Sequence, residues 1–359
     1  MKKIRTAVIG AGKMGALHSR IYSRMEHVHL VAVVDTDLPK AEKLVAEFGG
    51  HAYSDFHHVL DKVDAVTISV PTDCHARIAE SFLARSIPVL VEKPLAATLP
   101  EARRLLQLAR EHNCPLQVGY SERFNPVVQA LARLHIEPRF MESQRISPYS
   151  FRSTDVGVVL DLMIHDIDIM LSLAHSPVAD IQAVGVNVLG PHEDIANVRL
   201  QFDHGCVANL TASRLALKTE RKIRIFSDQA YLSLDYLKKT GTMISKADNI
   251  DMVTWLQQQQ ENGPVDPANL NWLELVHVEM LNIDDRESLE LEQEAFINAV
   301  RHGSRPQVSA DDAVAAMELA QRIINVIRQH PWPTTPFAPA AEIREIKPAP
   351  AKVSSKEKI

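Results

Sequence analysis

Short apolar runs alternate with helical segments through the first third of the chain. The apolar runs predict five buried strands, at residues 4–9, 30–34, 64–70, 88–91 and 116–119. Between them, helix-forming stretches predict helices at residues 16–25, 38–48, 75–85 and 100–113, with a short helix at 56–61. Strands that are apolar on both faces and alternate with helices are typical of a doubly wound parallel sheet.

From residue 121 onward the pattern changes to longer strands joined by short polar turns. Strands are expected at residues 140–146, 181–189, 195–202, 206–214, 221–227, 230–235 and 273–283. One helix, at 157–173, interrupts them, and helices at 287–302 and 310–329 follow. Hairpin spacing of this kind favours a largely antiparallel sheet. We therefore expect an α/β domain at residues 1–121 and an α+β domain at 122–330.

Three further segments carry local signals. Ser309 and Asp312 have the spacing of a capping box at the start of the last helix, with Asp in place of the usual Glu. The polar, glutamine-containing stretch 238–271 is expected to be an extended loop, either a lid over the site or a surface insertion. Residues 331–359 are rich in Pro, Ala and Lys and predict a flexible tail.

Composition narrows the class of protein. The chain has 359 residues, 46% of them apolar, and a formal net charge of −6, which argues against nucleic acid as a partner. No apolar run is long enough to cross a membrane. The three cysteines are far apart and form no C-x-x-C pair, so we expect a reducing, cytoplasmic compartment, no disulfides and no metal site.

A glycine-rich loop follows the first strand directly and opens the first helix. It contains Gly10, Gly12, Lys13, Met14 and Gly15. The first glycine permits the turn, the second lets the backbone approach a pyrophosphate, and the third lets the helix pack closely. Asp35 ends the second strand, where a carboxylate accepts hydrogen bonds from ribose hydroxyls and repels the 2′-phosphate of NADP. These residues predict a dinucleotide site with NAD as the cofactor.

Lys93 lies in a Glu-Lys-Pro sequence at the end of the fourth strand. Open α/β sheets bind ligands at the carboxyl ends of their strands, so Lys93 is expected near the nicotinamide. An ammonium there stabilises the alkoxide that forms as hydride leaves a hydroxyl-bearing carbon, and Glu92 is placed to hold the lysine. The alternative is a surface lysine at a strand end.

Asp161 and His165 are four residues apart in the predicted helix 157–173, so they share a helix face. A carboxylate beside an imidazole fixes its tautomer and raises its pKa, which suits a general acid or base. The alternative is a histidine that covers a polar patch on an otherwise apolar helix.

Together these patterns resemble the glucose-fructose oxidoreductase, inositol dehydrogenase and rhizopine-catabolism (Gfo/Idh/MocA) family of NAD(P)-dependent oxidoreductases. Its marks here are Gly10-x-Gly12-x-x-Gly15, Pro71-Thr72-x-x-His75, Glu92-Lys93-Pro94, Arg123-Phe124-x-Pro126 and Asp161-x-x-x-His165. The resemblance implies a Rossmann domain and then an open-faced sheet domain, paired into homodimers or homotetramers. It implies Lys93 and His165 around the reacting hydroxyl, with Asp161 beside them. Pro71, Thr72, His75 and Glu92 are then expected to contact the cofactor, as are Lys93 and the glycine loop.

The stretch 145–161 enters the catalytic helix and is expected to border the substrate. Arg145 and Arg152 suit a pyrophosphate, because a guanidinium fork matches phosphate oxygens; Arg123 and Tyr149 complete the expected substrate contacts. The alternative is a solvated loop. The stretch resembles the branch of the family that oxidises the 3-hydroxyl of UDP-N-acetylglucosamine. That resemblance implies a downstream aminotransferase that makes a 3-amino sugar for lipid A.

Other functions remain open at this stage. One is a dehydrogenase or reductase of the same fold with another substrate, such as an inositol, another free sugar or a tetrapyrrole. A second, from a different class, is a sensor or scaffold that binds NAD without turnover, which would not need Lys93, Asp161 or His165.

Overall fold

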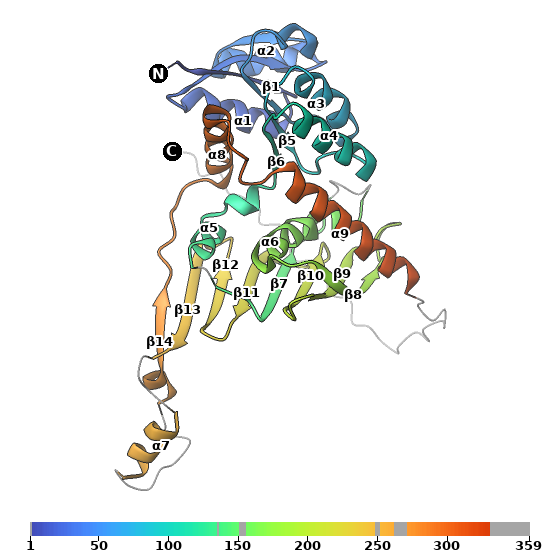
Figure 1. The fold of residues 1–359 in the computed structure, drawn as a ribbon. Coiled ribbons are helices and arrows are strands. Elements are labelled where there is room, and N and C mark those ends of the chain that lie inside the picture. The colour runs from blue at the N-terminus through green and yellow to red at the C-terminus, as the bar shows by residue number, and fades with distance from the viewer. Residues whose placement is uncertain (1, 135, 151–155, 248–251, 262–270, 331–359) are drawn as a thin grey trace, which may run out of the picture.

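The structure is a computed structural model, and it describes residues 2–330 apart from 135, 151–155, 248–251 and 262–270. Two β-sheets make up the fold, one from the N-terminal part of the chain and one from the remainder (Figure 1). The long helix α9 (Ala310–Gln329) packs against elements of both parts. Predicted as residues 310–329, it begins with the expected capping box between Ser309 and Asp312.

The N-terminal sheet has the order β3-β2-β1-β4-β5-β6, and all its strand pairs are parallel. Its strands are β1 (Ile4–Ile9), β2 (Val28–Val34), β3 (His51–Tyr53), β4 (Ala65–Ile68), β5 (Val89–Glu92) and β6 (Leu116–Gly119). The predicted doubly wound sheet is confirmed, although the three-residue β3 was not expected. The strand order reverses between β1 and β4, which is where such sheets bind ligands.

The helices that connect these strands are α1 (Lys13–Arg24), α2 (Leu38–Phe48), α3 (His75–Leu83) and α4 (Leu99–Glu111). Short 3₁₀ helices lie at Phe56–Val59 and Thr72–Cys74. Thr98 and Glu101 form a capping box that starts α4, so local side-chain chemistry sets this helix end. The alternation of strand and helix agrees with the pattern of the sequence.

The second sheet has the order β14-β13-β12-β11-β7-β10-β9-β8. Its strands are β7 (Phe140–Ile146), β8 (Val178–Val186), β9 (Ile195–Phe202), β10 (Val207–Ser213), β11 (Glu220–Phe226), β12 (Ala230–Asp235), β13 (Thr240–Lys246) and β14 (Val276–Met280). Only β7 and β10 are parallel neighbours among the described strands; the other pairs are antiparallel. The largely antiparallel sheet is therefore confirmed.

Helices cover one face of this sheet and leave the other open. α5 (Pro126–Ala132), α6 (Ile164–Ala174) and α9 lie on the same side of it (Figure 1). Along β9, exposed and buried residues alternate strictly, as a sheet with a single covered face requires. Val186, Ile195 and Phe226 are each 38% exposed.

The last helices return to the N-terminal sheet. α8 (Ser288–His302) packs against α1, and Gln117 of β6 forms a bridge with Ser309. Elements of the later chain thus help to cover the first sheet, and the domain boundaries at 121 and 330 stay predictions.

The predicted loop at 238–271 is wrong for its described residues. It contains β13 and α7 (Met252–Glu261). α7 lies beyond the end of β14, at the far end of the molecule from the N-terminal sheet, so within one chain it does not cover that sheet (Figure 1). α5 is a second element that was not expected.

Two other expectations concern the chain as a whole. Among residues 2–330, as far as they are described, no helix is both long and apolar enough to cross a membrane. The predicted tail at 331–359 lies outside the described residues.

Candidate active site

The turn after β1 is packed tightly on one side and open on the other. Gly10 has a φ of +105°, and a Cβ there would lie 2.4 Å from the carbonyl oxygen of Ser69. A Cβ on Gly15 would lie 1.8 Å from the carbonyl oxygen of Gly10, whereas one on Gly12 would meet nothing within 4 Å. Gly12 caps α1 without a side-chain hydrogen bond, which leaves the N–H groups of the first turn for an anion.

Asp35 borders this turn. Its Oδ2 accepts a hydrogen bond of 2.7 Å from the backbone N–H of Ala11, and its Oδ1 accepts one of 2.9 Å from that of Asp37. A carboxylate has about four acceptor positions, so lone pairs remain for ribose hydroxyls. The open backbone at Gly12 and the fixed carboxylate of Asp35 fit NAD, with Lys13 and Met14 in the first turn of α1.

The structure places His75 differently from the prediction. His75 is buried, with only 1% of its surface exposed. Nδ1 lies 2.9 Å from the carbonyl oxygen of Pro94, and Nε2 lies 3.0 Å from that of Val70. His75 therefore joins the loops after β4 and β5 through both ring nitrogens, and its expected cofactor contact is corrected. Pro71 and Thr72 lie in the first of these loops, and their cofactor contacts stay predictions.

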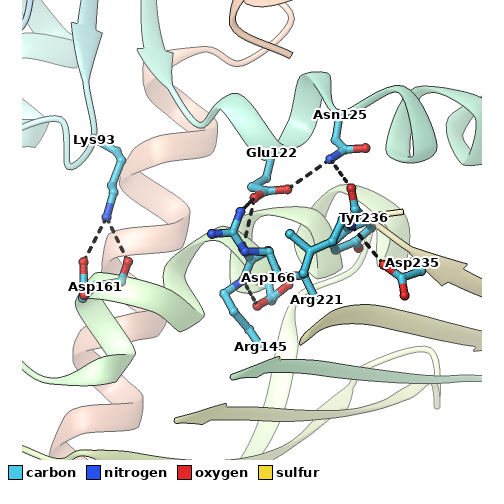
Figure 2. A network of polar contacts seen from close by, with 10 residues as sticks. Lys93, Glu122, Asn125, Arg145, Asp161, Asp166, Arg221, Asp235 and Tyr236 are labelled. Carbon is cyan, nitrogen blue, oxygen red and sulfur yellow. Dashed lines mark hydrogen bonds and ion pairs between the residues drawn. The ribbon is translucent and has the colours of Figure 1, made fainter. Parts of the chain in front are cut away.

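Lys93 and Asp161 come together between the two sheets. Lys93 Nζ donates a 2.9 Å hydrogen bond to the backbone carbonyl of Asp161 and lies 3.6 Å from its Oδ1 (Figure 2). Burial lowers the pKa of Lys93, and the carboxylates of Asp161 and Glu92 oppose that shift. Lys93 thus extends from the end of β5 to the helical segment that carries Asp161 and His165.

The helix that carries Asp161 is not α-helical throughout. Residues Val159–Met163 form a π-helical turn, and α6 starts at Ile164. The expected shared face of Asp161 and His165 assumed α-helical spacing, which the wider turn changes. Within the described residues no hydrogen bond joins these two side chains; Asp161 is the partner of Lys93. This part of the prediction is corrected.

His165 is half-buried, and its Nδ1 is covered and has no hydrogen-bond partner among the described residues. The ring meets Tyr120 edge-on, with centroids 6.0 Å apart. Burial lowers the pKa of His165 well below its usual value, and the positive charges of Lys93, Arg145 and Arg221 lower it further. The expected rise is therefore wrong. A neutral imidazole can accept a proton, so the lowered pKa favours His165 as a general base.

Arg145 is a buried structural residue and does not reach a ligand. Its guanidinium donates to both carboxylate oxygens of Asp166, at 2.7 and 3.0 Å, and to Glu122 at 3.1 Å (Figure 2). Arg221 donates to the same Glu122 oxygen at 2.7 Å. We call Glu122, Arg145, Asp166 and Arg221 the arginine cluster. The phosphate role expected for Arg145 is corrected, because the residue is buried and Nε, Nη1 and Nη2 each donate to Asp166 or Glu122.

The arginine cluster ties the site together. Burial alone would raise the pKa of Glu122, but Arg145 and Arg221 outweigh it and hold that pKa below the usual range. Burial keeps the pKa of Asp166 above its usual value despite Arg145. Because Asp166 directly follows His165, this cluster fixes the first turn of α6 to β7 and to the loop after β6.

The other expected substrate contacts have mixed outcomes. Arg123 donates to both oxygens of the buried Asp168, at 3.0 and 3.3 Å, so its guanidinium is committed to α6 and its substrate role is corrected. The ring centroid of Tyr149 lies 5.8 Å from the guanidinium carbon of Arg214. A substrate contact of Tyr149 stays a prediction, and Arg152 lies outside the described residues.

Glu92 makes a contact that the sequence pattern did not predict. Its Oε1 lies 2.9 Å from Nε2 of His18 in α1, and its expected cofactor contact stays a prediction. Glu292 lies beside it, fully buried. The sequence pattern did not single out His18 or Glu292. A signal for Glu292 was present, since its spacing from Leu289 and Phe296 puts a carboxyl on the apolar stripe of α8.

Comparison with known proteins agrees with this geometry. Residues 4–120 match the family model of an oxidoreductase family with an NAD-binding Rossmann fold, and residues 132–233 match the GFO/IDH/MocA C-terminal domain. The expected NAD cofactor and oxidoreductase class are thereby confirmed.

Individual relatives point in two directions. UDP-N-acetylglucosamine 3-dehydrogenase from Acidithiobacillus ferrooxidans is 35% identical over 241 residues, 67% of this chain and 76% of its own. A solved structure of that enzyme has a TM-score of 0.81 and 29% identity, and covers 92% of this chain and all of its own. Inositol 2-dehydrogenase from Leifsonia xyli is 33% identical over 189 residues, 50% of this chain and 56% of its own. On sequence, fold and site geometry, the chain belongs to the Gfo/Idh/MocA family of NAD-binding oxidoreductases.

Proposed function

We propose that the protein oxidises the 3-hydroxyl of UDP-N-acetylglucosamine to the 3-keto sugar with NAD. The observation that carries the chemistry is the pairing of Lys93 with Asp161 beside a histidine that burial keeps neutral. The similarity to a UDP-N-acetylglucosamine 3-dehydrogenase supports the substrate.

The residues divide the reaction as follows. The imidazole of His165 accepts the proton of the 3-hydroxyl, and the ammonium of Lys93 stabilises the developing oxyanion. Bound NAD supplies the acceptor for the hydride from C3. Asp161 fixes the position of Lys93 through its backbone carbonyl and its carboxylate. The glycine loop and Asp35 hold the cofactor's pyrophosphate and ribose.

The proposal extends to the partners of the protein and to its cellular compartment. A 3-keto sugar is the substrate type that an aminotransferase converts to a 3-amino sugar, here one destined for lipid A. The open face of the second sheet supports pairing into a homodimer or homotetramer, because its apolar side chains are exposed. Three unpaired cysteines, Cys74, Cys114 and Cys206, suit a cytoplasmic enzyme.

A substrate panel tests the proposal. NADH formation is measured with UDP-N-acetylglucosamine, free N-acetylglucosamine and myo-inositol, each with a carbonyl trap or with an amine donor and the partner aminotransferase. These additions are needed because oxidation of a secondary alcohol by NAD is uphill near neutral pH. We expect a 3-keto or 3-amino product from the sugar nucleotide only, with His165→Ala as the inactive control.

The second candidate is an inositol or free-sugar dehydrogenase, which the inositol 2-dehydrogenase relative favours. Turnover of myo-inositol or a free hexose, with none of the sugar nucleotide, would establish that candidate instead. NAD binding without turnover of any of these compounds would point to the sensor.

A further inference from the structure

A second group of buried carboxyls lies behind Lys93. Glu92 ends β5, and its Oε1 is 2.9 Å from Nε2 of His18 in α1. Its other oxygen lies against β6: a Cβ on Gly119 would be only 3.1 Å from Oε2. Glu292 of α8 completes the group, since one ligand-type atom of each of the three side chains lies within 4.8 Å of the others. We call His18, Glu92 and Glu292 the acid cluster.

The acid cluster lacks the usual compensation for buried charge. Glu292 is 0% exposed, and neither of its carboxyl oxygens has a hydrogen-bond partner among the described residues. Among the described residues, no lysine or arginine forms an ion pair with Glu92 or Glu292. Lys93 follows Glu92 but directs its ammonium to Asp161. Two carboxylates this close in a largely buried site repel one another, so one of them takes up a proton or a cation lies between them.

The histidine distinguishes these two possibilities. A histidine bound to a metal almost always donates its other ring N–H to a partner. Nδ1 of His18 is buried and has no partner among the described residues. The tautomer with hydrogen on Nε2 instead donates to Glu92 and leaves only a lone pair at Nδ1. The geometry therefore favours a proton.

We propose that the carboxyls of Glu92 and Glu292 share one proton and that this pair, with His18, positions Lys93 for the reaction. Glu292 is thus a positioning residue: it acts on Glu92, whose main chain leads directly into Lys93. The positioning half of this inference rests on the proposed function, whereas the shared proton does not.

The surroundings of Glu292 support the shared proton. α1 presents His18 and Tyr22, β5 presents Glu92, and β6 presents the neutral Gln117, whose amide donates to the Glu292 backbone carbonyl at 2.9 Å. The ionisable residues of the loop after β6, Glu122 and Arg123, pair elsewhere, with Arg145, Arg221 and Asp168. Glu290 and Glu294 of α8 pair with Arg286. Burial raises the pKa of Glu292 well above its usual value, and Glu92 raises it further.

Thermal unfolding of Glu292→Gln against pH tests the shared proton. A carboxyl whose pKa is higher in the folded than in the unfolded protein makes stability fall as pH rises above the unfolded pKa of about 4.3. Glutamine keeps the shape and cannot ionise, so this loss disappears in the variant. We expect the Tm of Glu292→Gln minus that of the wild type to grow from pH 5 to pH 8, by roughly 2–4 °C. Glu290→Gln, 43% exposed on the same helix, should show no such trend.

Two measurements on the whole protein complete the test. The infrared band of protonated carboxylic acid at pH 7 should be weaker in Glu292→Gln than in the wild type by the contribution of one carboxyl. The buried Asp168, whose pKa burial raises to about 7, contributes to the band in both proteins. The kcat should stay near wild type in Glu292→Gln and fall roughly tenfold or more in Glu292→Leu, with KM for NAD unchanged.

Each contrary result overturns one half of the inference, either the shared proton or the positioning role of Glu292. A Tm difference that does not change with pH, or an acid band equally strong in wild type and Glu292→Gln, shows that Glu292 is ionised and overturns the shared proton. A Tm of the wild type that EDTA lowers, with one bound metal per chain, shows that a cation takes the proton's place. Equal kcat in the glutamine and leucine variants overturns the positioning role. The unfolding and infrared results stand even if no substrate in the panel is turned over.

Discussion

Two buried clusters of carboxyls adjoin the candidate site, and they differ in what balances their charge. In the arginine cluster, Arg145 and Arg221 donate to Glu122, and Arg145 also holds Asp166. In the acid cluster, the imidazole of His18 is the one basic side chain within hydrogen-bond distance of Glu92 among the described residues, and Glu292 lies beside them. Both lie where side chains from distant parts of the chain meet.

The difference concerns what each cluster contributes to the site. The arginine cluster keeps its charges, and those of Arg145 and Arg221 add to burial and to Lys93 in lowering the pKa of His165. The acid cluster removes a charge by protonation, so it can fix Glu92 without placing a second negative charge behind Lys93. We therefore expect the arginine cluster to help set the pKa of His165 and the acid cluster to hold Lys93 in place.

The largest effect is expected where the influence of the two clusters converges. Lys93→Ala and His165→Ala should each lower kcat by about 10²–10⁴-fold, the usual contribution of an acid–base group. NAD binding, measured by calorimetry, should remain nearly intact, because the glycine loop and Asp35 are untouched. Near wild-type turnover in either variant would remove that residue from the mechanism.

Loss of Arg145 from the arginine cluster should lower the free energy of unfolding. Arg145→Met leaves Glu122 and Asp166 without their main partner, and breaking a buried ion pair in this way costs about 3–5 kcal/mol of unfolding free energy. Denaturant unfolding measures it. Arg139→Met, which removes an exposed pair with Asp228, is the control and should change stability little. A small effect of Arg145→Met would mean that the arginine cluster does not hold α6.

A smaller effect is expected at Asp161. Asp161→Asn keeps the backbone carbonyl that accepts from Lys93 and removes only the carboxylate at 3.6 Å. The kcat should fall less than in Lys93→Ala, by about tenfold. A loss as large as that of Lys93→Ala would mean that the carboxylate itself takes part in proton transfer.

The smallest effect tests the electrostatic role of the arginine cluster. Because the pKa of His165 is lowered, the acid limb of the kcat–pH profile should lie below the ordinary imidazole value of about 6.5. Arg221→Gln removes one of the charges that lower this pKa, so the limb should move to higher pH by a fraction of a unit. Arg224→Gln on the same strand should leave it in place, since Arg224 pairs with the exposed Glu142. Coincident profiles for the two variants would contradict the assignment.

Local features were predictable from the sequence. The capping box at Ser309 and the glycine loop depend on residues within a few positions of one another, and both are present in the structure. The stretch 238–271 shows where composition misleads. Its polar residues predicted a loop, yet it contains β13, and within that strand a Cβ on Gly241 would meet Leu234 at 2.6 Å and Leu281 at 2.9 Å. A glycine that admits a close neighbour looks the same in sequence as one that makes a turn.

Roles that depend on long-range partners were not predictable. Arg145 suited a phosphate by its chemistry, but its partners Glu122 and Asp166 are 23 and 21 residues away and reach it only in the folded chain. The π-helical turn similarly redirected Asp161 from His165 to Lys93. Lys93, Asp161 and His165 were identified by pattern, whereas their mutual geometry required the fold.

The central claim is that hydride leaves C3 of a UDP-linked sugar under the control of Lys93 and His165. The most direct test uses UDP-N-acetylglucosamine that carries deuterium at C3, with NAD and a carbonyl trap, and mass spectrometry of the reduced cofactor. The account predicts one deuterium per NADH, and none in the His165→Ala control. Unlabelled NADH from this substrate would contradict it, because the hydride would then come from another position.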